Sequence, residues 1–140
     1  MSLARFCRKT VAVIQPSQSI AEAAEAMRNR HVGALVVVED DLRPVGMLTD
    51  RDVVTRVVAA RKDATAVSVA EVMTPQPVTA RVEDSLDRTL FTMRQQGVRR
   101  VPIVDAHGRV AGLVSLDDVL VLLAAELDQT AAAVRDNQGP

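Results

Sequence analysis

The chain has 140 residues, the usual size of one domain, and its 17 Lys and Arg residues nearly balance its 18 Asp and Glu residues. This balance excludes the basic field that attracts nucleic acid or anionic lipid. The absence of Trp and Tyr, with only Phe6 and Phe91 as aromatic residues, argues against a platform on which single-stranded bases stack. The single cysteine, Cys7, excludes an intrachain disulfide, and no apolar run approaches the ~20 residues of a membrane span.

An internal repeat organises the sequence. Shifting the chain by 66 residues aligns it with itself without a gap, and identical residues recur along its length, among them Ser19 with Ser85, Met27 with Met93, Gly46 with Gly112 and Asp52 with Asp118. Chance rarely produces an ungapped match that spans a whole chain, so we predict a duplicated unit. The first repeat is placed at 1–67, with an N-terminal segment and a linker, and the second at 68–140, with a C-terminal helix and a tail.

The first repeat is predicted to contain a strand, a helix, a hairpin and a second helix. An extended piece at 11–14 precedes a helix of about three turns, which Ser19 caps and Glu22 completes as a capping box. Apolar runs at 34–38 and 45–48, joined by a polar turn, indicate the hairpin. The valines of 53–58 indicate a closing helix, although a strand stays possible there because valine is an indifferent helix former.

The second repeat follows the same order after the polar linker at 61–66. An extended piece at 78–82 precedes a helix that Ser85 caps and Gly97 ends, and a hairpin and an apolar closing helix follow. Residues 136–140 are predicted as a frayed tail. The fold class is therefore α+β, with two repeats of β-α-β-β-α that are related by a pseudo-twofold axis and packed through their sheets, since neither repeat has much of a core alone.

A short motif closes each hairpin. In the first copy, Gly46 and two apolar residues precede Thr49, and Asp52 follows three residues later. The second copy has Gly112, Ser115 and Asp118 at the same spacing. A hydroxyl with an acid three residues later is the spacing of a helix cap, and both motifs can be caps only. A strand-to-helix corner also points free N–H groups outward, which favours an anion such as phosphate, and the carboxylate suits sugar hydroxyls. Pseudo-twofold symmetry would place both corners on one shared cleft.

The element order, the segment from Gly97 to Asp105 and the two glycine–hydroxyl–acid motifs together resemble the CBS domain, a regulatory repeat that occurs in tandem pairs known as Bateman modules. The resemblance covers nearly the whole chain. It implies a module that binds adenosyl ligands such as AMP, ADP, ATP or S-adenosylmethionine, with no obligatory cofactor. It also implies that such pairs dimerise.

The same resemblance assigns the site residues by position. Asp52 and Asp118 become ribose ligands, with Thr49 and Ser115 as their hydroxyl partners. Basic residues at the start of the second strand of the opposite repeat would meet the phosphate.

That basic position differs between the copies. Arg99 and Arg100 would face the Asp52 motif, whereas Gly33 and Ala34 would face the Asp118 motif, so we expect the Asp52 site to bind phosphate better. One feature favours the Asp118 site instead. The first strand of the second repeat has the polar Thr79 where the first repeat has Val13, and the resemblance implies that a polar side chain at this position contacts the ligand. The remaining ligand-binding candidate in this stretch is Pro102.

The leading functional prediction is a non-catalytic, energy-sensing regulatory module that binds an adenine nucleotide and signals its occupancy to its own dimer or to an unidentified protein target. The alternative is a structural or interaction dimer with empty ligand sites. An enzyme ranks low, because no nucleophile, base or phosphate-loop glycine pattern accompanies the acids. No metal site is expected, because the two histidines and the one cysteine lie far apart. The N-terminus lacks a secretory signal, which predicts a cytoplasmic protein. The balanced charge and the lack of a long apolar run predict no nucleic-acid or membrane partner.

Overall fold

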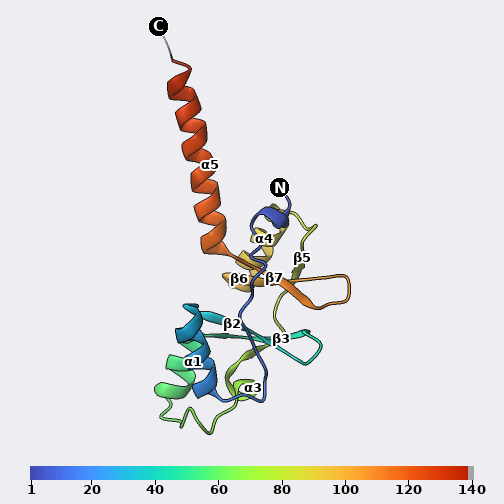
Figure 1. Ribbon diagram of the computed structural model, residues 1–140, viewed down its shortest axis with the longest axis vertical. Coiled ribbons are helices and arrows are strands. Elements are labelled where there is room, and N and C mark those ends of the chain that lie inside the picture. The colour runs from blue at the N-terminus through green and yellow to red at the C-terminus, as the bar shows by residue number, and fades with distance from the viewer. Residues whose placement is uncertain (139–140) are drawn as a thin grey trace.

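The computed structural model describes residues 1–138 and contains two sheets, each with helices on one face (Figure 1). The α+β fold with two repeats packed through their sheets is confirmed. The first half of the chain contains η1 (Leu3–Arg5), β1 (Val13–Ile14), α1 (Ile20–Arg30), β2 (Ala34–Val38), β3 (Pro44–Thr49), α2 (Asp50–Val53) and η2 (Val54–Val58). The second half contains α3 (Val69–Val72), β4 (Thr74–Pro75), β5 (Ala80–Arg81), α4 (Leu86–Gln96), β6 (Arg100–Val104), β7 (Val110–Ser115) and α5 (Leu116–Asp136).

The two repeats share one strand topology. In the first, β1 runs parallel to β2, and β2 pairs with β3 as the predicted antiparallel hairpin. In the second, β5 runs parallel to β6, and β6 pairs with β7. Each hairpin has one register irregularity at the equivalent place, next to Val38 and next to Val104, so the duplication extends to the detail of the strands.

Local capping explains where the first helix of each repeat begins and ends. Ser19 and Glu22 form the predicted capping box at the start of α1, and Ser85 accepts a hydrogen bond from the Arg88 amide at the start of α4. Gly97 ends α4 in the left-handed conformation, with φ of 64°. The equivalent residue at the end of α1 is His31, which adopts the same conformation without being glycine, with φ of 53°.

The opening segment of each repeat packs on the other repeat. Leu3 and Phe6 are buried in the core of the second repeat, whereas Val69 and Val72 are buried in the core of the first. The exchange continues into the sheets, because β4 pairs with β3 and Arg8 forms a β-bridge with Leu113 of β7. The division at 67/68 stays a prediction from the sequence repeat, and the packed cores cross it.

The two sheets meet through faces that the helices leave free. In β2, Leu35 and Val37 belong to the first core, whereas the alternate residue Val36 is fully buried outside it, on the opposite face of the strand. Pro102, the equivalent of Val36 in β6, is buried in the same way. A hydrogen bond of 2.8 Å from the Val110 amide to the Leu42 carbonyl also joins the repeats.

The closing helices differ most between the repeats. In the first repeat α2 continues directly into a π-helical turn, η2, so the alternative of a strand at 53–58 is wrong. In the second, α5 extends without a break to Asp136 and projects away from the rest of the molecule (Figure 1). Of the predicted tail, Asp136 still belongs to this helix, and 139–140 lie outside the described residues.

Candidate ligand clefts between the repeats

The first cleft lies between the Thr49–Asp52 corner and the start of β6, and it has a volume of about 590 Å³. One wall comes from the end of β3 and the first turn of α2, and the opposite wall comes from residues 96–100 of the second repeat. The stretch from Thr74 to Val78 closes a third side. The structure thus brings four predicted site residues together: Thr49, Asp52, Arg99 and Arg100.

Asp52 is held in place by the backbone of its own corner. Its Oδ2 accepts a hydrogen bond of 2.9 Å from the Thr49 amide, and the Thr49 hydroxyl accepts one of 3.1 Å from the Asp52 amide. Its Oδ1 lies 3.6 Å from an Arg56 guanidinium nitrogen, and a second nitrogen of Arg56 donates to the Val72 carbonyl at 2.7 Å. The predicted helix cap is therefore present, and the side chain of Asp52 is only 17% exposed.

Three arginines line this cleft. Arg51 comes from α2, and Arg99 and Arg100 come from the opposite repeat. Arg99 donates to Asp117 at 2.8 Å, but both side chains are about two-thirds exposed. Arg99 can therefore exchange Asp117 for another anion at little cost. Arg100 forms no ion pair within residues 1–138. The cleft therefore combines a fixed carboxylate on one wall with guanidinium groups on the other.

The second cleft is the pseudo-symmetric counterpart and is smaller, at about 230 Å³. Ser115 and Asp118 lie on one wall, and Gly33 and Ala34 lie on the opposite wall, as the resemblance implied. Apart from Arg100, every residue that lines this cleft is the equivalent, 66 positions away, of a residue that lines the first. The two clefts are thus the same site built twice with different side chains.

Arg8 forms an ion pair with Asp118, the acid of the second cleft. Its guanidinium donates to Asp118 Oδ1 at 2.6 Å, and the Ser115 hydroxyl accepts from the Asp118 amide at 3.1 Å, but the reciprocal bond that completes the box at Asp52 is not formed. Burial is the largest single effect on Asp118 and raises its pKa. The hydrogen bonds of Arg8 and Ser115 and the charge of Arg8 outweigh it, so the net pKa of Asp118 lies below the usual value.

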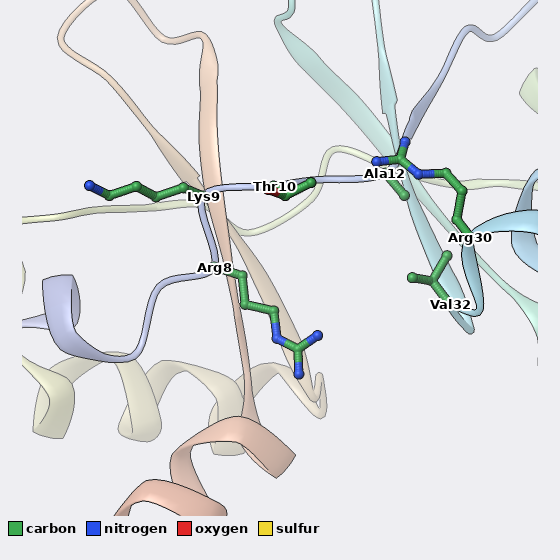
Figure 2. A pocket seen from close by; sticks show the side chains of 6 residues that line it. All are labelled: Arg8, Lys9, Thr10, Ala12, Arg30 and Val32. Atoms are coloured by element: carbon green, nitrogen blue, oxygen red, sulfur yellow. The ribbon is translucent and has the colours of Figure 1, made fainter.

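A cationic hollow of about 550 Å³ adjoins the second cleft and shares Arg8, Thr10, Ala12 and Val32 with it. Lys9 and Arg30 complete its lining. Figure 2 shows that the Arg8 side chain extends toward the start of α5, whereas Lys9 points away to the other side. The second cleft therefore has basic neighbours, although the two residues that face its acid from the opposite strand are Gly33 and Ala34.

Comparison with known proteins gives the family. The CBS-domain model matches residues 3–59 and 69–125, which together make up most of the chain. The chain belongs to the CBS-domain family and carries a tandem pair. The CBS domain-containing protein YhcV of Bacillus subtilis is 41% identical over 79% of this chain and 77% of that protein. The uncharacterized protein MK0525 of Methanopyrus kandleri is 30% identical over 86% of this chain, and the match spans 61% of that protein's length.

A solved structure gives the same family and fold. The CBS domain pair of protein MJ0100 has a TM-score of 0.80 and 25% sequence identity, over 90% of this chain and 98% of that chain. That structure is a complex with 5′-methylthioadenosine and S-adenosyl-L-methionine. CBS pairs are in general regulatory elements.

Three predicted site residues lie outside both clefts of the CBS pair. Thr79 lines a separate hollow with α4 residues such as Arg88, and Val13 lines neither cleft. Pro102 is buried between the two sheets. The neighbours of the first two, Val78 and Ala12, line the clefts instead, and Val78 also lines the hollow that contains Thr79.

Sequence reasoning missed the residues that the exchanged segments carry into the clefts. Thr74 to Val78 enter the first cleft, and Arg8 and Thr10 enter the second. His31, which ends α1, lines the second cleft as well. The repeat makes Arg8 the equivalent of Thr74, but it gives no indication of which core either segment joins.

Within residues 1–138, no helix is long and apolar enough to cross a membrane. Nor does that part of the chain contain a group of three or more His, Cys, Asp and Glu side chains that could hold a metal ion.

Proposed function

We propose that this CBS pair is a non-catalytic regulatory module that binds an adenine nucleotide in the first cleft and signals its occupancy to its own dimer or to a protein target. The observation that carries the proposal is the Asp52 carboxylate, fixed by the Thr49 amide, opposite a wall with Arg99 and Arg100. The volume of about 590 Å³ lies within the range of small-molecule sites. The adenosyl compounds bound by the MJ0100 pair support the ligand class.

The cleft offers a separate group for each part of a nucleotide. Asp52 Oδ1 is outside the cap and would accept the ribose hydroxyls, because Oδ2 already accepts the Thr49 amide. Arg99, Arg100 and Arg51 would bind the phosphates, since guanidinium groups form paired, charge-assisted hydrogen bonds with phosphate oxygens. The apolar atoms of Pro77 and other lining residues would cover the base.

This assignment ranks AMP, ADP and ATP above ligands without phosphate. It also ranks the first cleft above the second, because Asp118 is already paired with Arg8 and its cleft is less than half as large. A cytoplasmic location stays a prediction from the sequence.

Isothermal titration of the purified chain with AMP, ATP and adenosine tests the proposal. We expect binding of the phosphorylated ligands, with adenosine weaker, and a loss of about tenfold or more on Asp52→Asn, which removes a charge-assisted bond to ribose. Asp41→Asn, in an exposed turn outside both clefts, is the matched control and should leave the affinity unchanged. Absence of binding would reject the function, and a larger loss from Asp118→Asn than from Asp52→Asn would reject the ranking.

The alternative function, an interaction dimer with empty ligand sites, is favoured by one specific observation. Leu120, Leu127 and Val134 recur at intervals of seven along α5 and are each more than half exposed. An apolar stripe of this spacing suits pairing with a second helix. Dimerisation is compatible with nucleotide binding, so the titration above separates the regulatory module from the pure interaction protein.

A further inference from the structure

We propose that Arg8 is a latch on the second cleft: it pairs with Asp118 when no ligand is present, so that this cleft accepts adenosyl ligands that bring their own anionic group and disfavours uncharged ones. The inference rests on the proposed function, because it assumes that Asp118 can receive a ribose. It adds a specificity-determining residue that belongs to neither glycine–hydroxyl–acid motif.

The backbone of Arg8 is fixed, whereas its side chain is largely exposed. The Arg8 amide donates to the Leu113 carbonyl at 2.9 Å, and the Leu113 amide donates back to the Arg8 carbonyl at the same distance. Phe6, two residues earlier, is 3% exposed in the second core. The Arg8 side chain itself is 67% exposed, so it can leave Asp118 without any change in the fold.

The first cleft has no such latch. The equivalent of Arg8 there is Thr74, which is too short to reach across to Asp52 and accepts a bond of 3.3 Å from Arg56 instead. Arg56 approaches Asp52 from the same helix, at 3.6 Å, and is anchored to the Val72 carbonyl. Asp52 therefore keeps its capping position, whereas the Asp118 carboxylate is committed to a residue from the N-terminal segment.

The adjoining hollow can hold the Arg8 side chain once it leaves Asp118. Arg8 lines both the second cleft and the hollow of about 550 Å³ that also contains Arg30 (Figure 2). A ligand that places a ribose on Asp118 and a phosphate in this hollow replaces the Arg8–Asp118 pair with two new pairs, one for each group. An uncharged ligand gives Asp118 a new partner but none to Arg8, whose guanidinium is then solvated only by water.

The test is a comparison of two ligands in the Asp52→Asn background, in which binding at the first cleft is weakened. ATP represents the phosphorylated class, and 5′-methylthioadenosine represents the uncharged class. We expect Arg8→Ala to weaken ATP about tenfold, the value of a charge-assisted hydrogen bond, and to leave 5′-methylthioadenosine unchanged or tighter. Arg8→Lys, which keeps the charge, should preserve the preference for ATP.

Arg5→Ala is the matched control. Arg5 lies in the same segment and forms an ion pair with Glu126 of the same helix, but it lines neither cleft. It should leave the ratio of the two affinities unchanged. An unchanged ratio in Arg8→Ala overturns the latch, whereas the loss of all adenosyl binding by the wild-type chain overturns the proposed function.

A ligand-free measurement tests the pairing by itself. The carboxyl carbon of Asp118 reports its protonation in an NMR titration, and Arg8→Ala should move the titration midpoint of Asp118 to higher pH. A midpoint that does not move contradicts the Arg8–Asp118 pairing whatever the ligands do.

Discussion

The Cys7 sulfur lies directly over Gly112, in the space that a Cβ at position 112 would fill, and the Arg8 carbonyl oxygen would be 2.9 Å from that Cβ. The equivalent pair in the first repeat, Met73 and Gly46, has the same relationship, with the Thr74 carbonyl at 3.1 Å. The glycine of each motif therefore makes room for the segment that arrives from the other repeat.

This contact predicts the effect of adding one methyl group. Gly112→Ala should destabilise the fold by about 1–3 kcal/mol, because the backbone of Arg8 cannot withdraw as a flexible side chain can. Chemical denaturation measures the change. The double variant Cys7→Ala/Gly112→Ala should recover part of the loss, since it removes the sulfur but not the carbonyl, and full stability of Gly112→Ala alone would contradict the close approach.

Because the opening segments are exchanged, a substitution in one repeat should destabilise the core of the other. Leu3 and Val69 are equivalent residues that are fully buried in opposite cores. Leu3→Ala should cost about 2–5 kcal/mol and Val69→Ala somewhat less. In hydrogen exchange, Leu3→Ala should loosen β6 and β7 first, and Val69→Ala should loosen β2 and β3. The reverse pattern would mean that each segment packs on its own repeat.

The Arg8–Asp118 pair predicts a dependence of stability on pH. The pKa of Asp118 is lowered in the folded state, so the pair stabilises the fold above the unfolded pKa of about 3.9 and loses this contribution as the pH falls through the folded pKa. The coupling should stay below about 1 kcal/mol, because the Arg8 side chain is 67% exposed. A double-mutant cycle with Arg8→Ala and Asp118→Asn, measured at neutral and at acidic pH, should show coupling only at neutral pH.

The apolar stripe of α5 predicts self-association. Leu127 is 71% exposed, and Leu127→Glu should shift the protein from dimer toward monomer in light scattering without loss of helical signal. Gln129→Glu adds the same charge on another face of the helix and serves as the control. If both variants keep the mass of the wild-type protein, α5 is not the dimer contact.

The parts of the fold that depend on local chemistry could be predicted from the sequence. Ser19 with Glu22, and Ser85 with Gly97, mark helix ends because their hydrogen bonds and backbone conformations involve neighbours in the chain. The exchange of segments could not be predicted. Leu3 and Val69 give the same apolar pattern whether they pack on their own repeat or on the other.

The same limit applied to the clefts. The resemblance paired each corner with the strand start of the other copy, and the structure brings Thr49 near Arg99 and Ser115 near Gly33. The repeat symmetry by itself predicted one shared cleft, whereas the two corners line two separate clefts. Arg8 was missed because its role depends on the crossing of the N-terminal segment, which leaves no periodic signal. Thr79 was included through the resemblance alone, and it lines a separate hollow outside both clefts.

The exchange of opening segments also says how this architecture relates to a single repeat. One repeat alone would lack the residues that fill its core, and two separate copies could supply them to each other, as in a domain-swapped dimer. The present chain has the topology of such a dimer joined end to end. It follows that fragments 1–67 and 68–140 should each be incompletely folded alone and should assemble when mixed, because each holds the piece that completes the other.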